Sequence, residues 1–346
     1  MPYPDIALLR ELGVQLPVIA APMAGGPSTP QLVTSAWDAG SLGFLAGGYK
    51  SAADLEAQAK AVAGSGAAFG VNLFVPNTVP VSAEDYRRYA RALAPEAAAY
   101  GIDLETVPLT EDDDAWTGKI DVVLAARPAI VTTTFGLPPG AAVGALHQAG
   151  IPVGITVTSG EEAKRAVEAG ADVLVVQASA AGGHSGTMTP ERLPEQVDLA
   201  ELVRRVRAVS TLPVIAAGGI GTSGDVARAL AAGAGAVAAG TALLRTAESG
   251  ASATHRAALA DPAFDRTVVT RSFTGRPARA LANRWTASYE DQAPLGYPAI
   301  HHLTAALRRA AAAAGHPDRV HLWAGTGWRD AREEPVAQAL GRLANF

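Results

Sequence analysis

A short unit recurs along the sequence and constrains the fold more than any other feature. In each copy an amphipathic helix ends in Ala-Gly, and a continuously apolar strand follows, as in RAVEAG before ADVLVVQ. Gly40, Gly150, Gly170 and Gly233 stand at these junctions, where a helix end favours a left-handed residue. Continuously apolar strands are typical of a parallel sheet that is buried on both faces. The repeat therefore predicts an α/β protein.

The apolar strands can be traced one by one. They are predicted at Val18–Ala21, Phe44–Ala46, Phe69–Phe74, Ile130–Phe135, Val153–Val157, Val173–Gln177, Val214–Ala217 and Ala236–Ala239. Eight strands with intervening helices favour a (β/α)8 TIM barrel, and an open doubly wound sheet is the alternative.

Two long segments interrupt this alternation of strands and helices. An insert over 76–121 follows the third strand and contains a predicted helix at Ser82–Ala99, and the extension 246–346 contains another at Ala299–Ala314. We expect both segments to form a lid or helical cap on the carboxyl ends of the strands, within a single domain over 1–346. The acidic run Glu111–Asp114 is expected to be a solvated loop without a chemical role.

Composition excludes several classes of function. The net charge is −5, and no block of Lys and Arg occurs, which argues against nucleic acid or a membrane surface as partner. No apolar run reaches the ~18 residues of a membrane span, and Asp5 and Glu11 argue against a signal peptide, so a cytoplasmic location is expected. Cysteine is absent, which excludes thiolate chemistry. No metal site is expected, because neighbouring His301 and His302 point about 100° apart on a helix.

Glycines follow the seventh and eighth strands. The segment PVIAAGGIGTSGD contains a GxGxxG pattern, but the next strand lacks the acid that a dinucleotide site requires about 20 residues on. In a barrel, the loops after these two strands commonly bind phosphate through backbone N–H groups at a helix N-terminus. Gly218, Gly219, Ala239, Gly240 and Thr241 are the candidates, and the alternative is that the glycines only make tight turns.

Polar side chains at other strand ends indicate a flat ligand. Asn72 lies within the third strand, Gln177 ends the sixth, and Met23 follows the first. Buried amides need hydrogen-bond partners, and two of them suit the donor–acceptor edge of a heterocycle such as an isoalloxazine; amides satisfied within the core are the alternative. In QASAAGGHSG, His184 stands between glycines, and the missing bulk would leave room for a ligand.

An ordered set of motifs carries a family resemblance. The motifs are APMAGG, FGVNLF, RPAIVTTTFGLP, QASAAGGHSG, PVIAAGGIG, AAGTALL, SFTGRPARALANRW, GYPAIHHLT and HLWAGTGW. Together they resemble the FMN-dependent nitronate monooxygenases of the bacterial class I type, formerly called 2-nitropropane dioxygenases, over almost the whole chain. Two departures from the family pattern are Ala180, where an acid is frequent, and Ala238–Ala239, where Gln-Met is frequent.

The resemblance implies an FMN site and a catalytic histidine. It places flavin contacts at Met23, Asn72, Gln177, Gly182, Gly183, Gly218, Gly219, Ala238, Ala239, Gly240 and Thr241. It implies that His184 either hydrogen-bonds a nitronate when protonated, which we favour, or acts as a base toward a neutral nitroalkane. The substrate pocket is expected to include Thr133, Phe135, Tyr297 and His301, with Trp323 as a further candidate.

The resemblance also implies a reaction. Alkyl nitronates such as propionate 3-nitronate would be oxidised by O2 to a carbonyl compound and nitrite, as a detoxification, by a monomer or homodimer. The alternatives are an FMN-dependent NAD(P)H enoyl-acyl carrier protein reductase, an NADH:quinone reductase, and a flavin-binding protein without catalytic activity. The inosine-monophosphate dehydrogenases share the phosphate glycines but require a cysteine, which this chain lacks.

Overall fold

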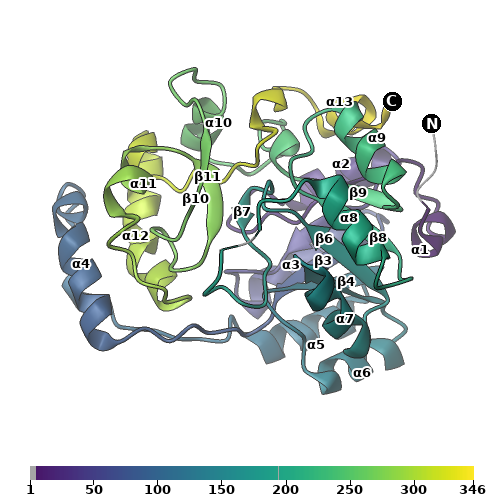
Figure 1. Ribbon diagram of the computed structural model, residues 1–346, viewed down its shortest axis with the longest axis horizontal. Coiled ribbons are helices and arrows are strands. Elements are labelled where there is room, and N and C mark those ends of the chain that lie inside the picture. Colours follow the sequence, from purple (N-terminus) through teal and green to yellow (C-terminus); the bar gives the residue numbers. More distant parts are fainter. Residues whose placement is uncertain (1–4, 194) are drawn as a thin grey trace.

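The barrel predicted from the repeat is confirmed. The computed structural model describes residues 5–193 and 195–346, and eight parallel strands close on one another in chain order (Figure 1). They are β1 (Val18–Ala20), β2 (Gly43–Ala46), β3 (Phe69–Phe74), β4 (Ile130–Thr134), β5 (Val153–Val157), β6 (Val173–Gln177), β8 (Val214–Ala217) and β9 (Ala236–Ala239). The closure pairs β9 with β1, with Ala238 opposite Ile19.

Helices surround the barrel, one after each strand. They are α2 (Pro30–Asp38), α3 (Ala52–Ala63), α5 (Trp116–Ala126), α6 (Gly140–Gln148), α7 (Gly160–Glu168), α8 (Leu199–Arg207), α9 (Ser223–Ala231) and α13 (Val336–Ala344). The four junction glycines of the repeat have φ between +72° and +106°, as a left-handed helix end requires. The largest apolar cluster lies between strands and helices, and a second cluster fills the barrel interior around Ile19, Phe44 and Ile215.

The last helix of the chain does not belong to the cap, in which the sequence analysis had placed the whole extension 246–346. α13 packs against α2, α9 and β1, so it completes the ring of barrel helices. Its residues Val336, Leu340 and Leu343 are fully buried at the spacing of one helix face. The extension after β9 therefore leaves the barrel and returns to it, and only its earlier part belongs to the cap.

The cap has its own core and its own sheet. The predicted helices are confirmed as α4 (Ala83–Ala98) and α12 (Ala299–Ala313), which lie with α11 (Arg284–Tyr289) beside the barrel (Figure 1). Tyr89, Phe273 and Trp285 are among the buried residues of their shared cluster. A three-stranded antiparallel sheet, which the sequence did not predict, joins β10 (Thr267–Thr270), β11 (Ala278–Leu281) and β7 (Gly183–His184). That the whole chain is a single domain stays a prediction.

Short elements complete the chain. They are α1 (Ala7–Glu11), α10 (Ala253–Ala258) and the 3-10 helices η1 (Leu104–Thr106), η2 (Thr241–Leu243), η3 (Pro317–Arg319) and η4 (Trp328–Asp330). Within residues 5–193 and 195–346, no helix is long and apolar enough to cross a membrane.

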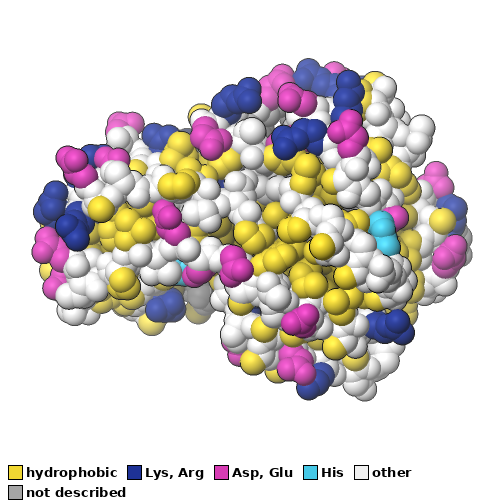
Figure 2. All heavy atoms as spheres, turned by 90° about the horizontal axis from the view of Figure 1, so that it is seen from below, with side chains coloured by type: hydrophobic (Ala, Val, Ile, Leu, Met, Phe, Trp, Pro, Cys, Tyr) yellow, Lys and Arg dark blue, Asp and Glu magenta, His cyan; other side chains and the backbone are white. Residues whose placement is uncertain are grey.

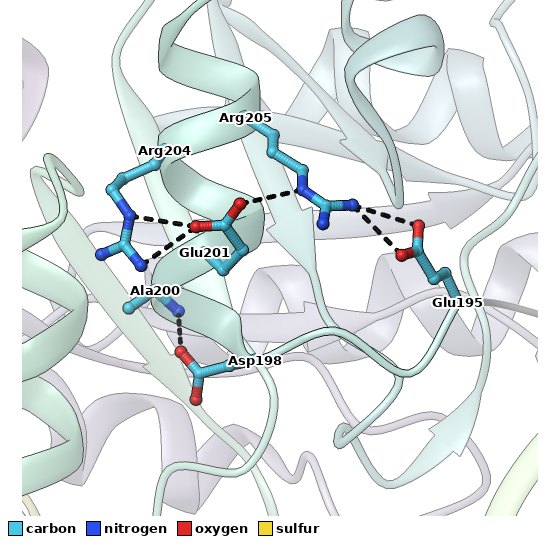
Figure 3. Close-up of polar contacts among 6 residues, drawn as sticks. All are labelled: Glu195, Asp198, Ala200, Glu201, Arg204 and Arg205. Atoms are coloured by element: carbon cyan, nitrogen blue, oxygen red, sulfur yellow. Dashed lines mark hydrogen bonds and ion pairs between the residues drawn. The ribbon is translucent and has the colours of Figure 1, made fainter.

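Surface charges are mixed in sign. In the view from below, hydrophobic side chains gather in the middle of both the cap lobe and the barrel lobe, and acidic and basic groups alternate around the edges (Figure 2). At the start of α8, Asp198 accepts from the Ala200 N–H, and Arg205 bridges Glu201 and Glu195 (Figure 3). The Arg205 ion pairs are exposed and contribute little to stability, but they connect the loop before α8 to the helix.

Candidate active site

A cavity of about 430 Å³ opens at the carboxyl ends of the barrel strands, under the cap. It brings together most of the residues that the sequence singled out. The lining includes Met23, Asn72, Phe135, Gln177, Gly182, Gly183, His184, Gly218, Gly219, Ala238, Gly240, Thr241 and Trp323. Segments from both ends of the chain thus meet at one site.

Two of the residues that were predicted to line the site point away from the cavity. Thr132 and Thr134 line the cavity, and side chains alternate along a strand, so Thr133 points toward the surrounding helices. Its hydroxyl lies 3.5 Å from the Gly154 carbonyl oxygen. Ala239 is likewise fully buried in the cluster between strands and helices. Thr133 therefore does not line the substrate space, and Ala239 can contribute only through its backbone.

Tyr297 and His301 lie in an adjoining cavity of about 530 Å³, which shares Tyr49 and Phe74 with the first. The Tyr297 ring centre is 5.8 Å from that of His184. The His301 ring stacks on Tyr49 at 4.0 Å. Both residues thus belong to the aromatic surroundings of His184, on the side of the cap.

His184 is held by the barrel and the cap at once. It belongs to β7 and pairs with Ala278 of β11. Gln177, at the end of β6, donates its Nε2–H to the His184 carbonyl at 3.2 Å and accepts from the Gly186 N–H at 2.6 Å. The amide of Gln177 therefore positions the histidine segment, which is a role that the sequence did not indicate.

The glycines beside His184 serve different purposes. A Cβ at Gly182 would lie 2.5 Å from the backbone nitrogen of Gly325, so this glycine is needed for the close approach of the cap. A Cβ at Gly186 would lie 2.6 Å from the Thr156 methyl group. Gly183 has φ +77° and open space beside it. Protein packing thus explains two of the glycines that we expected to make room for a ligand.

His184 is neutral at physiological pH. Burial lowers the pKa of His184 to about 3, and the charges of Arg276 and Arg308 add to this effect. Its Nε2 lies 2.8 Å from the Thr274 hydroxyl, which is 3.3 Å from the Arg276 carbonyl oxygen. When that hydroxyl donates to the carbonyl, Nε2 carries the hydrogen and Nδ1 keeps its lone pair, 3.5 Å from the Tyr49 hydroxyl. The protonated form favoured from the sequence does not fit this setting.

The glycine loops after β8 and β9 present free donors. Gly218 and Gly219 have φ of +114° and +76°, and no partner for their N–H groups, or for that of Gly240, is found among the described residues. By contrast, the carboxylate of Asp225 already accepts from the Gly221 and Thr222 N–H groups at the start of α9. Free donors suited to a phosphate are thus found at the glycines that the sequence singled out, whereas the N–H groups at the start of α9 are already occupied.

Asn72 presents an acceptor to the cavity. Its Nδ2 donates to the hydroxyls of Thr132 and Thr134, both at 3.0 Å, and the side chain is buried. The amide oxygen is left to accept from a ligand N–H. Met23, in the loop after β1, lines the cavity beside Gly240. The site thus combines a phosphate cradle with an edge suited to a flat, hydrogen-bonding ring.

Tyr49 and Asp114 were missed by the sequence reasoning. Tyr49 follows β2 with φ +66°, and its N–H donates to Asp114 Oδ1 at 3.0 Å. The other Asp114 oxygen lies 2.7 Å from Nζ of Lys119, whose side chain is 1% exposed. Three acids of the run are exposed as expected, but Asp114 is not. The position of Tyr49, three residues after the end of β2, was the available signal.

Replacing Asp114 is expected to destabilise the fold. Asp114→Ala leaves Lys119 buried without its partner and should lower the free energy of unfolding by about 3 kcal/mol. Asp113→Ala, at the exposed neighbour, is the matched control and should change it by less than about 0.5 kcal/mol. The midpoint of urea unfolding measures both, and equal midpoints would contradict the assigned role.

Buried neutral histidines make stability depend on pH. Burial lowers the pKa of His255 from 6.5 to about 4. Between these values the unfolded chain binds more protons than the folded one, so stability falls as pH falls, by up to about 1.4 kcal/mol per pH unit for each such group. Between pH 7 and pH 4.5 the melting temperature of His255→Gln should fall less than that of the wild type. The melting temperature of His316→Gln, a substitution at an exposed site, should fall as much as that of the wild type. An unchanged pH dependence in His255→Gln would refute this origin.

Comparisons with known proteins agree on one family. The family model described as nitronate monooxygenase matches residues 7–345. A nitronate monooxygenase of Pseudomonas aeruginosa is 39% identical over 96% of this chain and 97% of its own length. A probable nitronate monooxygenase of Bacillus subtilis is 34% identical over 97% of each chain.

Solved structures agree with the sequence comparisons. A nitroalkane oxidase from Streptomyces ansochromogenes superposes with a TM-score of 0.89 at 43% identity, covering 98% of this chain and 97% of that one. FabK from Thermotoga maritima reaches a TM-score of 0.74 at 23% identity, covering 97% of this chain and 94% of that one, a likeness in fold alone. The chain is thus an oxidoreductase, and it belongs to the nitronate monooxygenase family.

Proposed function

We propose that this chain binds FMN in the cavity under the cap and oxidises alkyl nitronates, such as propionate 3-nitronate, with O2. The observation that carries the proposal is the meeting of free loop amides, the acceptor of Asn72 and a neutral, half-buried His184 in one cavity. When bound, FMN would accept electrons from the substrate and pass them to O2.

The chain's residues fit the two ends of this cofactor. The amides of Gly218, Gly219 and Gly240 would hold the phosphate, and the Thr241 hydroxyl, which accepts from the Gly325 N–H at 3.0 Å, still has its own hydrogen to donate. Asn72 would accept from the N–H edge of the flavin ring. The cap segment around Gly325 closes the cavity over the loops and would exclude water.

The reaction balances without NAD(P)H. Two nitronate anions and one O2 give two carbonyl compounds and two nitrite ions. At each carbon the C=N bond breaks and a C=O bond forms with an oxygen atom from O2, so that carbon is oxidised and O2 is reduced. No further reductant is needed, in contrast to the enoyl reductase alternative.

His184 is suited to the role of a base. A neutral imidazole with a lone pair on Nδ1 can take a proton from the carbon of a neutral nitroalkane and produce the nitronate within the site. The Thr274 hydroxyl would hold the ring in this tautomer through Nε2. The similar Streptomyces protein is named a nitroalkane oxidase, which supports the inclusion of neutral nitroalkanes among the substrates.

Detoxification of reactive nitronates is the physiological role that fits this chemistry. The predictions of a cytoplasmic location and of a monomer or homodimer are not tested by the fold and stay predictions.

Substitution of His184 tests the function and the role of the residue together. The wild type should release nitrite from propionate 3-nitronate and consume half as much O2, with no need for NADH. His184→Asn should keep bound FMN and lose about 10²-fold or more of its activity with neutral nitroethane, because it lacks the base, while activity with a preformed nitronate should fall less. Nitrite and O2 assays check both substrates.

Two results would contradict this account. Oxidation of NADH without release of nitrite would move the assignment to the enoyl reductase alternative. Equal losses with nitroethane and with nitronate in His184→Asn would remove the role of His184 as a base.

A further inference from the structure

The walls of the cavity carry positive charge only. Among the described residues that line it, the basic ones are Arg308, Arg309, His184, His255 and His321, and neither Asp nor Glu is among them. This one-sided charge contrasts with the net charge of −5 of the whole chain. A cavity of this kind favours an anion.

Arg308 is the buried cation of this group. Its side chain extends from α12 and is 4% exposed. Nε donates to the Thr304 hydroxyl at 3.0 Å, and Nη2 donates to the carbonyl oxygen and Nδ1 of His301 at 3.0 and 3.2 Å. All these acceptors are neutral. No carboxylate forms an ion pair with Arg308 in the described part of the chain, and its Nη1 has no hydrogen-bond partner there.

Arg308 remains a cation although it is buried. Burial lowers the pKa of Arg308 to about 10, which keeps the guanidinium protonated at neutral pH. A buried charge without a counter-charge is costly, and the cost is recovered when an anion binds beside it.

A second guanidinium lies behind the cavity wall. Arg276 is fully buried, and its charged centre lies 3.9 Å over the ring of Phe135, which lines the cavity. Its Nη2 donates to the Thr187 carbonyl oxygen, and its Nη1 has no partner among the described residues. Two unpaired cations thus converge on the neighbourhood of His184, whose pKa both of them lower.

The position of Arg308 points to the substrate and not to the phosphate. Arg308 donates to His301, His301 stacks on Tyr49, and the Tyr49 hydroxyl is 3.5 Å from His184. The glycine loops that would hold the phosphate lie at the ends of β8 and β9, beside the cap segment around Gly325.

We propose that Arg308 is a specificity-determining residue, whose guanidinium binds the negatively charged oxygens of the nitronate while Arg276 adds to the positive field from behind Phe135. The inference rests on the proposed function. It assigns the positive charge of the site to an arginine, with His184 left neutral as a base. The same guanidinium would stabilise the anion that forms when His184 removes a proton from a neutral nitroalkane.

Two substitutions of Arg308 test the inference. In the FMN-loaded protein, Arg308→Gln should raise the KM for propionate 3-nitronate and the Kd of nitrite, which serves as an anionic probe followed by flavin absorbance, at least ~30-fold. The KM for neutral nitroethane should change less than ~3-fold. Arg308→Lys should recover part of the anion affinity, because it restores the charge but not the forked donor geometry. Arg91→Gln, an exposed cap residue, is the control.

The outcomes separate this inference from the proposed function. Wild-type turnover of nitronate together with unchanged KM and nitrite Kd in Arg308→Gln would overturn the inference alone. Equal increases in KM for nitronate and nitroethane would also overturn it, because they would indicate a merely structural role. If the wild type releases no nitrite from any nitronate, yet Arg308→Gln still weakens nitrite binding, the anion site stands and the proposed function fails.

Discussion

The pairing of two residues of β7 with β11 is the constraint on which the site depends. It places His184 in a sheet of the cap, while Gln177 ties the same segment to the end of a barrel strand. Neither the barrel nor the cap alone would fix the ring. The absence of a side chain at Gly182 lets the backbone around Gly325 approach closely enough for this arrangement. The barrel thus supplies the cavity, and the cap supplies the orientation of the residue at its centre.

Charge in the site is distributed in an unusual way. The histidines, which are commonly the titrating groups of an active site, are kept neutral by burial, and the permanent charges belong to Arg276 and Arg308. A neutral base next to fixed cations suits a substrate that becomes an anion during the reaction. As the pH falls from neutral, the stability of the fold therefore decreases first, and the charge of the site changes only at lower pH, near the lowered pKa values of its histidines.

Local patterns explain what could be predicted from the sequence. The strands and the helices α4 and α12 follow from apolar runs, helical periodicity and an N-cap serine, all of which are local signals. The sheet of the cap was not predicted, because its strands are only two to four residues long and β7 pairs with β11 across about 90 positions, as His184 and Ala278 do. The direction of Thr133 was missed because a one-residue change of register moves a side chain to the opposite face. The buried pair of Asp114 and Lys119 was missed because burial of an acid is not visible in an acidic run.

Electron transfer from nitronate to bound flavin is the central claim, and one anaerobic experiment tests it directly. The FMN-loaded protein is mixed with propionate 3-nitronate without O2, and the flavin absorbance is followed, with NADH in a parallel sample. Prompt bleaching by nitronate and no change with NADH are the predicted results. Bleaching by NADH, with no change on addition of nitronate, would contradict the account.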